Sequence, residues 1–192
     1  MDTKSVMIVG VGGQGTLLTS RLLGAALLKN NFDVKVSEVH GMSQRGGSVV
    51  TYVKFGSSVN SPIVGLGEAD LILAFEQLEA ARWLPYLKKG GKLITNTQKI
   101  DPMPVVIGNA EYPDGVLEAI EKTGVALTSI DALSLAVKAG SPKAVNVVLI
   151  GVLAKKMDLP YETWIEAIKE TVPEKFLDMN LKAFDYGYSY SK

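Results

Sequence analysis

The fold of this chain is decided by the stretch VMIVGVGGQG, which occupies residues 6–15 and runs directly into the apolar helical pattern of Thr16–Lys29. The apolar, mostly β-branched run Val6–Val9 predicts a buried strand, and the glycines that follow it predict a tight strand-to-helix turn. The amides and the dipole at the start of such a helix attract an anion. The loop is therefore either a cradle for a phosphate or carboxylate group or a tight turn that binds no ligand.

A polar, glycine-rich segment follows the second predicted strand, Val34–Ser37. Glu38 stands where a dinucleotide-binding chain places its ribose-binding acid, but we interpret it as a strand-end acid that forms a salt bridge or caps the next loop. The segment that follows is HGMSQRGG at residues 40–47, and after it comes the strand-like run Ser48–Phe55 instead of the expected helix. Because a turn joins this strand to its predecessor, we expect the two strands to be antiparallel.

Together the two motifs resemble those of a known family. GVGGQG at residues 10–15 and SEVHGMSQRGGSV at residues 37–49 look like the small, gamma-type subunits of the 2-oxoacid:ferredoxin oxidoreductases. The HGMSQRGG form is most similar to the beta subunits of the indolepyruvate type. The resemblance covers nearly the whole chain, including Gly65–Asp70 before a strand and Asn146 ahead of Leu149–Gly151. A glycine loop alone is common among nucleotide enzymes, whereas the two motifs in this order and spacing are specific to the family that they resemble.

The resemblance implies an oxidative decarboxylation of 2-oxoacids, aryl pyruvates in the indolepyruvate type, to acyl-CoA with electrons passed to ferredoxin. It implies that a large partner subunit carries thiamine diphosphate and cysteine-bound iron–sulfur clusters, and that ferredoxin meets the assembled complex. This chain would then be an accessory subunit, inactive alone, that completes the complex and could shape the approach of coenzyme A or of the 2-oxoacid substrate.

The expected binding surface combines the glycine loop with the polar segment, since both follow strands at the edge where open α/β sheets bind ligands. The planar fork of Arg45 matches a carboxylate or phosphate, although a solvent-exposed turn is the alternative. His40 titrates near neutrality, but no acid or nucleophile is arranged with it in the sequence. We assign no catalytic or metal-binding residue. The predicted cofactor-binding residues are Gly10, Gly12, Gly13, Gln14, Gly15, His40, Ser43, Gln44, Arg45, Gly46 and Gly47.

The composition indicates one globular domain and narrows the function classes. The 192 residues are 47% hydrophobic and 21% charged, and 20 basic residues balance 20 acidic ones, so no basic excess favours nucleic acid or an anionic membrane. No apolar run approaches the roughly 20 residues of a membrane span, and residues 1–5 lead directly into a strand, so we expect a cytoplasmic protein without a signal peptide. The absence of cysteine excludes iron–sulfur clusters and cysteine-ligated zinc held by this chain alone, and the single histidine excludes a histidine-rich metal site.

The apolar patterns along the chain predict a three-layer, Rossmann-like α/β domain with a mostly parallel, mixed sheet. We expect a single domain over residues 1–192, with an α/β core at 1–140 and C-terminal helices at 141–192. Acids at the start of the helix at 76–88 are interpreted as stabilising its dipole, and Asp131 as an N-cap. The predicted strands are 6–9, 34–37, 48–55, 71–74, 92–95, 105–107 and 126–129, and the predicted helices are 16–29, 76–88, 114–122, 131–139, 144–157, 161–171 and 173–186.

Two other functions remain open from the residues alone. The glycine loop and Glu38 would suit a stand-alone nicotinamide- or flavin-dependent oxidoreductase, which would bind a nucleotide resin and show cofactor absorbance. A non-catalytic interaction module unconnected to oxoacids would not co-purify with a cysteine-rich thiamine subunit.

Overall fold

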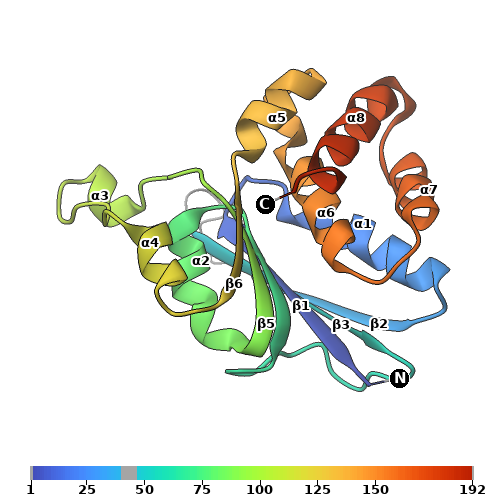
Figure 1. Ribbon diagram of the computed structural model, residues 1–192, viewed down its shortest axis with the longest axis horizontal. Coiled ribbons are helices and arrows are strands. Elements are labelled where there is room, and N and C mark those ends of the chain that lie inside the picture. Colours follow the sequence, from blue (N-terminus) through green and yellow to red (C-terminus); the bar gives the residue numbers. More distant parts are fainter. Residues whose placement is uncertain (1, 40–46, 192) are drawn as a thin grey trace.

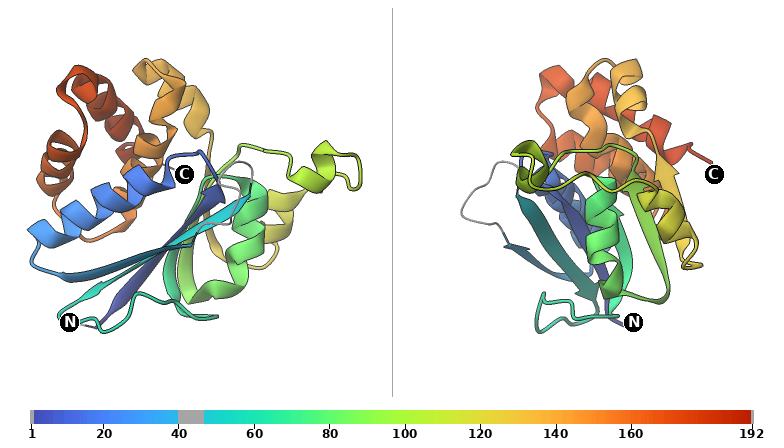
Figure 2. Two further views of the ribbon diagram at one scale, coloured as in Figure 1. Left: turned by 180° about the vertical axis from the view of Figure 1, so that it is seen from behind. Right: turned by 90° about the vertical axis from the view of Figure 1, so that its left-hand side faces the viewer.

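The computed structural model describes residues 2–39 and 47–191 and shows a six-stranded sheet between two layers of helices (Figures 1 and 2). The strand order is β2-β3-β1-β4-β5-β6, and β3 is antiparallel to both of its neighbours, whereas β1, β4, β5 and β6 are parallel. This confirms the predicted mixed sheet and the antiparallel strand after residue 47. The strands are β1 (Lys4–Val11), β2 (Asp33–Val39), β3 (Ser48–Gly56), β4 (Ala69–Ala74), β5 (Leu87–Asn96) and β6 (Ala126–Ile130).

Each face of the sheet is covered by its own layer of helices because apolar side chains alternate along the strands. In β1, Val6 and Ile8 face one hydrophobic cluster while Met7 and Val9 face the other. The first cluster is closed by α1 (Thr16–Lys29), α5 (Ala132–Ala139), α6 (Val145–Lys156), α7 (Tyr161–Thr171) and α8 (Leu177–Tyr188). The second is closed by α2 (Gln77–Trp83) and α4 (Val116–Glu121). The predicted three-layer architecture with a helical C-terminal section is confirmed.

Helices α6 and α8 cross at a pair of glycines. A Cβ atom built on Gly151 would lie 2.2 Å from the carbonyl oxygen of Phe184, and one built on Gly187 would lie 1.9 Å from the carbonyl oxygen of Val148. Both distances are far shorter than any side chain permits, so the two backbones are in direct contact. The residues Asn146–Ala154 of α6 are all buried, which makes this helix the centre of its layer.

The helix predicted over residues 76–88 is shorter than expected. Helix α2 ends at Trp83, a 3-10 turn covers Leu84–Tyr86, and β5 begins at Leu87. Pro85 has no N–H to donate and cannot continue the helix. Leu87 instead pairs with Ala69 of β4, so the cationic and glycine-rich residues 88–91 belong to a strand and not to a helix C-terminus.

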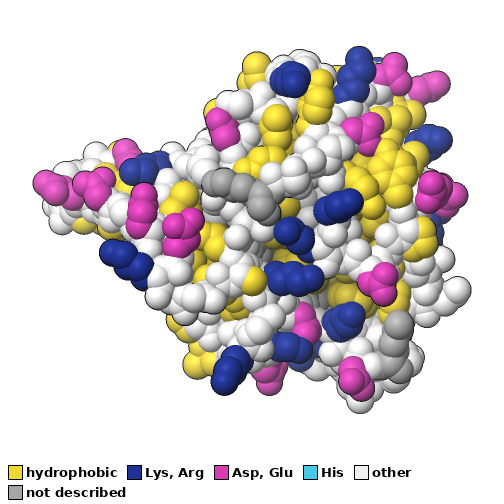
Figure 3. Space-filling view, viewed as in Figure 1, with side chains coloured by type: hydrophobic (Ala, Val, Ile, Leu, Met, Phe, Trp, Pro, Cys, Tyr) yellow, Lys and Arg dark blue, Asp and Glu magenta, His cyan; other side chains and the backbone are white. Residues whose placement is uncertain are grey.

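The strand predicted at residues 105–107 is also wrong. These β-branched residues belong to the short helix α3 (Met103–Val106) and its end, where Ile107 N–H donates to the Met103 carbonyl at 3.0 Å. Residues 101–111, here called the arm, project from the body of the molecule between β5 and α4 (Figures 1 and 3). None of residues 101–115 is buried. The local pattern suits a strand, but these residues pair with no strand of the sheet in the described part of the chain.

Candidate binding site at the glycine loop

The glycine loop joins β1 to α1 with two residues in the left-handed region. Gly13 and Gly15 have φ values of +97° and +85°, which glycine adopts without steric cost. Gly15 occupies the N-cap position of α1, and no side chain of the described residues caps the helix there. The first amides of α1 therefore point out of the helix toward solvent or a ligand.

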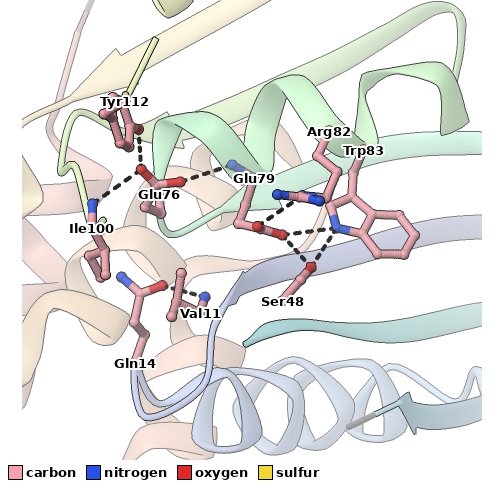
Figure 4. A network of polar contacts seen from close by, with 9 residues as sticks. All are labelled: Val11, Gln14, Ser48, Glu76, Glu79, Arg82, Trp83, Ile100 and Tyr112. Carbon is pink, nitrogen blue, oxygen red and sulfur yellow. Dashed lines mark hydrogen bonds and ion pairs between the residues drawn. The ribbon is translucent and has the colours of Figure 1, made fainter. Parts of the chain in front are cut away.

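Gln14 ties the loop to the neighbouring strands. Its side-chain carbonyl accepts the Val11 N–H at 2.7 Å (Figure 4), and its amide nitrogen donates to the Phe75 carbonyl at 3.1 Å and to Gln98 at 3.4 Å. Gly10 lies inside β1 and not in the turn. A Cβ atom there would lie 2.8 Å from Gln14 Oε1 and 2.9 Å from Phe75 Cβ, so Gly10 is needed for this close packing.

A hollow of about 530 Å³ opens beside the loop. Its size is within the range of small-molecule sites, which span about 300–1,000 Å³. Among the residues that line it, Lys143 carries a positive charge and none is a carboxylate, so the hollow suits an anionic group. The residues that line it are Gly13, Gln14, Gly15, Gln98, Leu133, Pro142, Lys143, Val145 and Asn146.

Asn146 brings the start of α6 against the glycine loop. A Cβ atom on Gly15 would lie 2.9 Å from Asn146 Nδ2, and Asn146 Oδ1 accepts the Val147 N–H at 2.9 Å. Helix α6 continues from the 3-10 turn Pro142–Ala144, at whose start the Ser141 hydroxyl accepts the Lys143 N–H at 3.2 Å. The starts of two helices thus converge on one hollow, and only that of α1 lacks a side-chain acceptor among the described residues.

The last residue of the polar segment lies at the same edge of the sheet as the glycine loop. The carbonyl of Gly47 accepts the Gly12 N–H at 2.9 Å, and Ser48 pairs with Val11 at the start of β3. For Gly47, the prediction that the two motifs share one edge of the sheet is confirmed. His40, Ser43, Gln44, Arg45 and Gly46 lie outside the described residues, so their roles stay predictions.

Glu38 is not placed as a dinucleotide-binding acid would be. It lies near the end of β2, and β3 separates β2 from the strand that carries the glycine loop. The hydroxyl of Ser20 in α1 donates to Glu38 Oε1 at 3.2 Å. The carboxylate therefore joins α1 to β2, which is a structural role.

Two buried carboxylates at the start of α2 form a wider network (Figure 4). Glu76, expected only to stabilise the helix dipole, caps the helix by accepting the Glu79 N–H at 2.9 Å, and it also accepts the Ile100 N–H at 3.3 Å and the Tyr112 hydroxyl. Burial, followed by this bond to Glu76, raises the pKa of Tyr112, which keeps the hydroxyl protonated as a donor. These tertiary contacts have no signature in the local sequence.

Glu79 links α2 to the first residue of β3. It accepts hydrogen bonds from the Ser48 hydroxyl, from the Trp83 indole at 3.2 Å and from Arg82 Nε at 3.1 Å. Since Ser48 directly follows Gly47, the buried carboxylate fixes the position at which the polar segment enters the sheet.

Five residues of the hollow were not predicted from the sequence: Gln98, Leu133, Pro142, Lys143 and Val145. A signal for Gln98 was present, because the polar run at residues 96–98 directly follows a buried strand at the binding edge. Lys143 follows a Gly-Ser-Pro break before an apolar helix, a pattern that marks a helix start but does not identify what faces it.

Within residues 2–39 and 47–191, no group of three or more acidic, histidine or cysteine side chains is placed to hold a metal ion. In the same ranges, no helix is both long and apolar enough to cross a lipid bilayer.

The comparisons with known proteins agree with the fold and with the resemblance of the two motifs. A family model described as pyruvate ferredoxin/flavodoxin oxidoreductase matches residues 5–190. The indolepyruvate oxidoreductase subunit IorB of Pyrococcus horikoshii is 46% identical, and the match covers 100% of this chain and 98% of that protein. The subunit of the same name from Thermococcus kodakarensis is 44% identical over the same shares.

Two solved structures have the same fold. Pyruvate oxidoreductase subunit PORC from Thermotoga maritima superposes with a TM-score of 0.75 at 19% identity, over 100% of this chain and 98% of that one. A 2-oxoglutarate:ferredoxin oxidoreductase from Magnetococcus marinus gives a TM-score of 0.75 at 20% identity, over 98% of this chain but 31% of that longer one. The chain belongs to the pyruvate ferredoxin/flavodoxin oxidoreductase family.

Proposed function

We propose that this chain is the small subunit of an indolepyruvate oxidoreductase, which oxidatively decarboxylates aryl pyruvates to acyl-CoA in the cytoplasm and passes the electrons to ferredoxin. The observation that carries the proposal is the 46% identity to subunit IorB of Pyrococcus horikoshii along the full length of both chains. In this function the chain needs a partner, because a sequence without cysteine supplies no ligands for cysteine-bound clusters. The large subunit would hold the clusters and thiamine diphosphate.

The edge formed by the glycine loop is proposed as the place where this chain meets an anionic ligand, and a phosphate group of coenzyme A is the candidate. The hollow fits such a group because the uncapped start of α1 and Lys143 face it and no carboxylate lines it. When bound, coenzyme A would supply the thiol that accepts the acyl group. Gln14 and Asn146 would hold the loop in shape. The proposed contacts from the polar segment are His40, Ser43, Gln44, Arg45, Gly46 and Gly47.

The subunit assignment predicts that activity depends on both polypeptides. The isolated chain should be colourless and should not turn over indolepyruvate with coenzyme A and a viologen acceptor. It should bind the separately produced large subunit and raise that subunit's activity well above the level of the large subunit alone, which serves as the control. Turnover by the isolated chain, or iron–sulfur absorbance in it, would contradict the assignment, and so would a failure to bind the large subunit.

If the hollow binds a phosphate of coenzyme A, reversing the charge at residue 143 should weaken the binding of coenzyme A. Lys143→Glu should raise the KM for coenzyme A of the reconstituted enzyme by about tenfold, equivalent to about 1.4 kcal/mol, because a carboxylate would then face the phosphate. The effect should shrink as salt is added, and the KM for indolepyruvate should change little.

Lys122→Glu is the matched control for this variant. It makes the same change in net charge at an exposed position after α4, away from the residues that line the hollow. An equal KM for coenzyme A in Lys143→Glu and in the wild type would exclude the hollow as the phosphate site.

A further inference from the structure

The arm, residues 101–111, exposes a cluster of large apolar side chains. Met103, Val106 and Ile107 are 60%, 65% and 60% exposed, and all three belong to α3 or its end. A projecting loop gains no stability from such residues, because they bury little area against their own chain. Clustered apolar side chains on a protruding surface mark interaction sites.

The arm is nevertheless built as a defined structure. Inside it, Asn109 N–H donates to the Pro104 carbonyl at 2.8 Å and Gly108 N–H donates to the Val105 carbonyl at 3.0 Å. Prolines at positions 102 and 104 restrict its backbone. A compact surface loop of this length with its ends held together is an Ω-loop, a type that frequently carries function.

A buried carboxylate closes the base of the arm. Glu76 is 1% exposed, and its Oε1 atom accepts both the Ile100 N–H, just before the arm, and the Tyr112 hydroxyl, just after it (Figure 4). A buried charge is costly unless hydrogen bonds compensate it, so these bonds hold the two ends of the arm in one place. Lys99 lies 5.3 Å from the centre of the Tyr112 ring and adds a contact at the same base.

The arm leaves the same edge of the sheet as the glycine loop. Gln98, two residues before Ile100, lines the hollow and accepts a hydrogen bond from Gln14 at 3.4 Å. The base of the arm therefore lies close to the proposed coenzyme A site.

The net charge around the arm is negative, and Figure 3 shows acidic side chains on the projecting end of the arm. From residue 99 to residue 122 the chain has five carboxylates and two lysines, and all five carboxylates are exposed. A symmetric contact between two arms would bring like charges together, which disfavours a second copy of this chain as the occupant. A partner surface with an apolar pocket bordered by lysine and arginine would complement the arm. The carboxylates are Asp101, Glu111, Asp114, Glu118 and Glu121.

We propose that the arm is the docking element for the large subunit, with Met103, Val106 and Ile107 inserted into an apolar pocket bordered by basic residues. This rests on the proposed function, which supplies the large subunit.

The test combines Met103→Ser, Val106→Ser and Ile107→Ser in the full-length chain and measures the affinity for the separately produced large subunit. The triple variant should melt within a few degrees of the wild type, because the replaced side chains are exposed. Its dissociation constant should rise at least a hundredfold, since central apolar anchors dominate binding. Added salt should slow association of the wild type, because the complementary charges steer the encounter.

The matched control replaces Leu28, Ile63 and Leu66 by serine. These side chains are 61%, 54% and 70% exposed, and they lie at the opposite edge of the sheet, where α1 ends and β4 begins. This control should bind like the wild type. If the arm variant also binds like the wild type, the arm proposal is overturned while the subunit assignment stands. If the wild type does not bind the large subunit, both fail. If the wild type is a dimer that the arm variant converts to a monomer, the occupant is a second copy and the proposal is overturned.

Discussion

Gly151→Ala should destabilise the chain by about 3 kcal/mol or more, which is at the upper end of the cost of overpacking a core. The added Cβ would lie 2.2 Å from the Phe184 carbonyl oxygen and 2.7 Å from the Tyr188 nitrogen, so the backbones of α6 and α8 have to separate. Gly151 lies in the middle of α6, so fraying of α6 cannot relieve the contact. The contacted last turn of α8 is held in place because the Tyr188 ring packs against Tyr161 and Phe184. Thermal unfolding should show a loss of roughly 6–12 °C, at about 2–4 °C per kcal/mol for a domain of this size.

Gly24→Ala provides the control, since it makes the same chemical change in the middle of α1. Apart from its chain neighbours and the backbone of its own helix, no atom of the described residues lies within 4 Å of a Cβ built there. The alanine should stabilise the chain by about 0.5–1 kcal/mol, because it restricts the unfolded chain and favours a helix. A Gly151→Ala variant that melts at or above the wild-type temperature would show that the two helices do not meet at this glycine pair.

Arg45→Ala should leave the isolated subunit folded and impair the assembled enzyme. Arg45 lies outside the described residues, but Gly47, two positions later, is bonded to the glycine loop through Gly12. If the guanidinium pairs with a partner carboxylate or with a coenzyme A phosphate, truncation leaves that group unpaired at a cost of about 2–5 kcal/mol in binding. Arg45→Lys should restore only part of the loss, because the planar fork is absent from lysine.

Three measurements distinguish the roles of Arg45: the melting temperature of the subunit, its affinity for the large subunit, and the KM for coenzyme A of the reconstituted enzyme. Lost assembly would place Arg45 at the subunit interface, and normal assembly with a raised KM would place it at the ligand. Arg21→Ala, at an exposed position of α1, is the control and should change none of the three. Wild-type behaviour of Arg45→Ala in all of them would indicate an exposed turn without function.

Local sequence patterns predicted the fold correctly wherever the regularly spaced apolar residues are also the residues buried in the core. The apolar residues of Val6–Val9 and the stripe of Thr16–Lys29 face the two clusters that form the core, so their pattern carried the tertiary information. The pattern was misleading in the arm, whose β-branched residues have no strand to pair with, and at residues 84–88, where Pro85 stops a helix and the chain becomes a strand. Exposure and pairing depend on distant parts of the chain and are not visible in a short window.

The binding edge could be predicted only in part, for the same reason. The glycine loop has a local signature because its turn needs left-handed residues at positions 13 and 15. Lys143 and Gln98 line the same hollow, but they come from segments about 130 and 85 residues away in the sequence, and only the strand order brings them together. The role of Glu76 at the base of the arm depends on contacts 24 and 36 residues away.

The insertion of β3 between β1 and β2 also sets a limit for protein engineering. Neighbouring strands are about 4.8 Å apart, so the extra strand places β2 about 10 Å from β1, twice the spacing of a dinucleotide-binding sheet. Exchanging side chains in the glycine loop or at Glu38 would leave that spacing unchanged. A redesign of this scaffold for a nicotinamide cofactor would have to excise β3 and reconnect the chain, because the obstacle is the backbone topology.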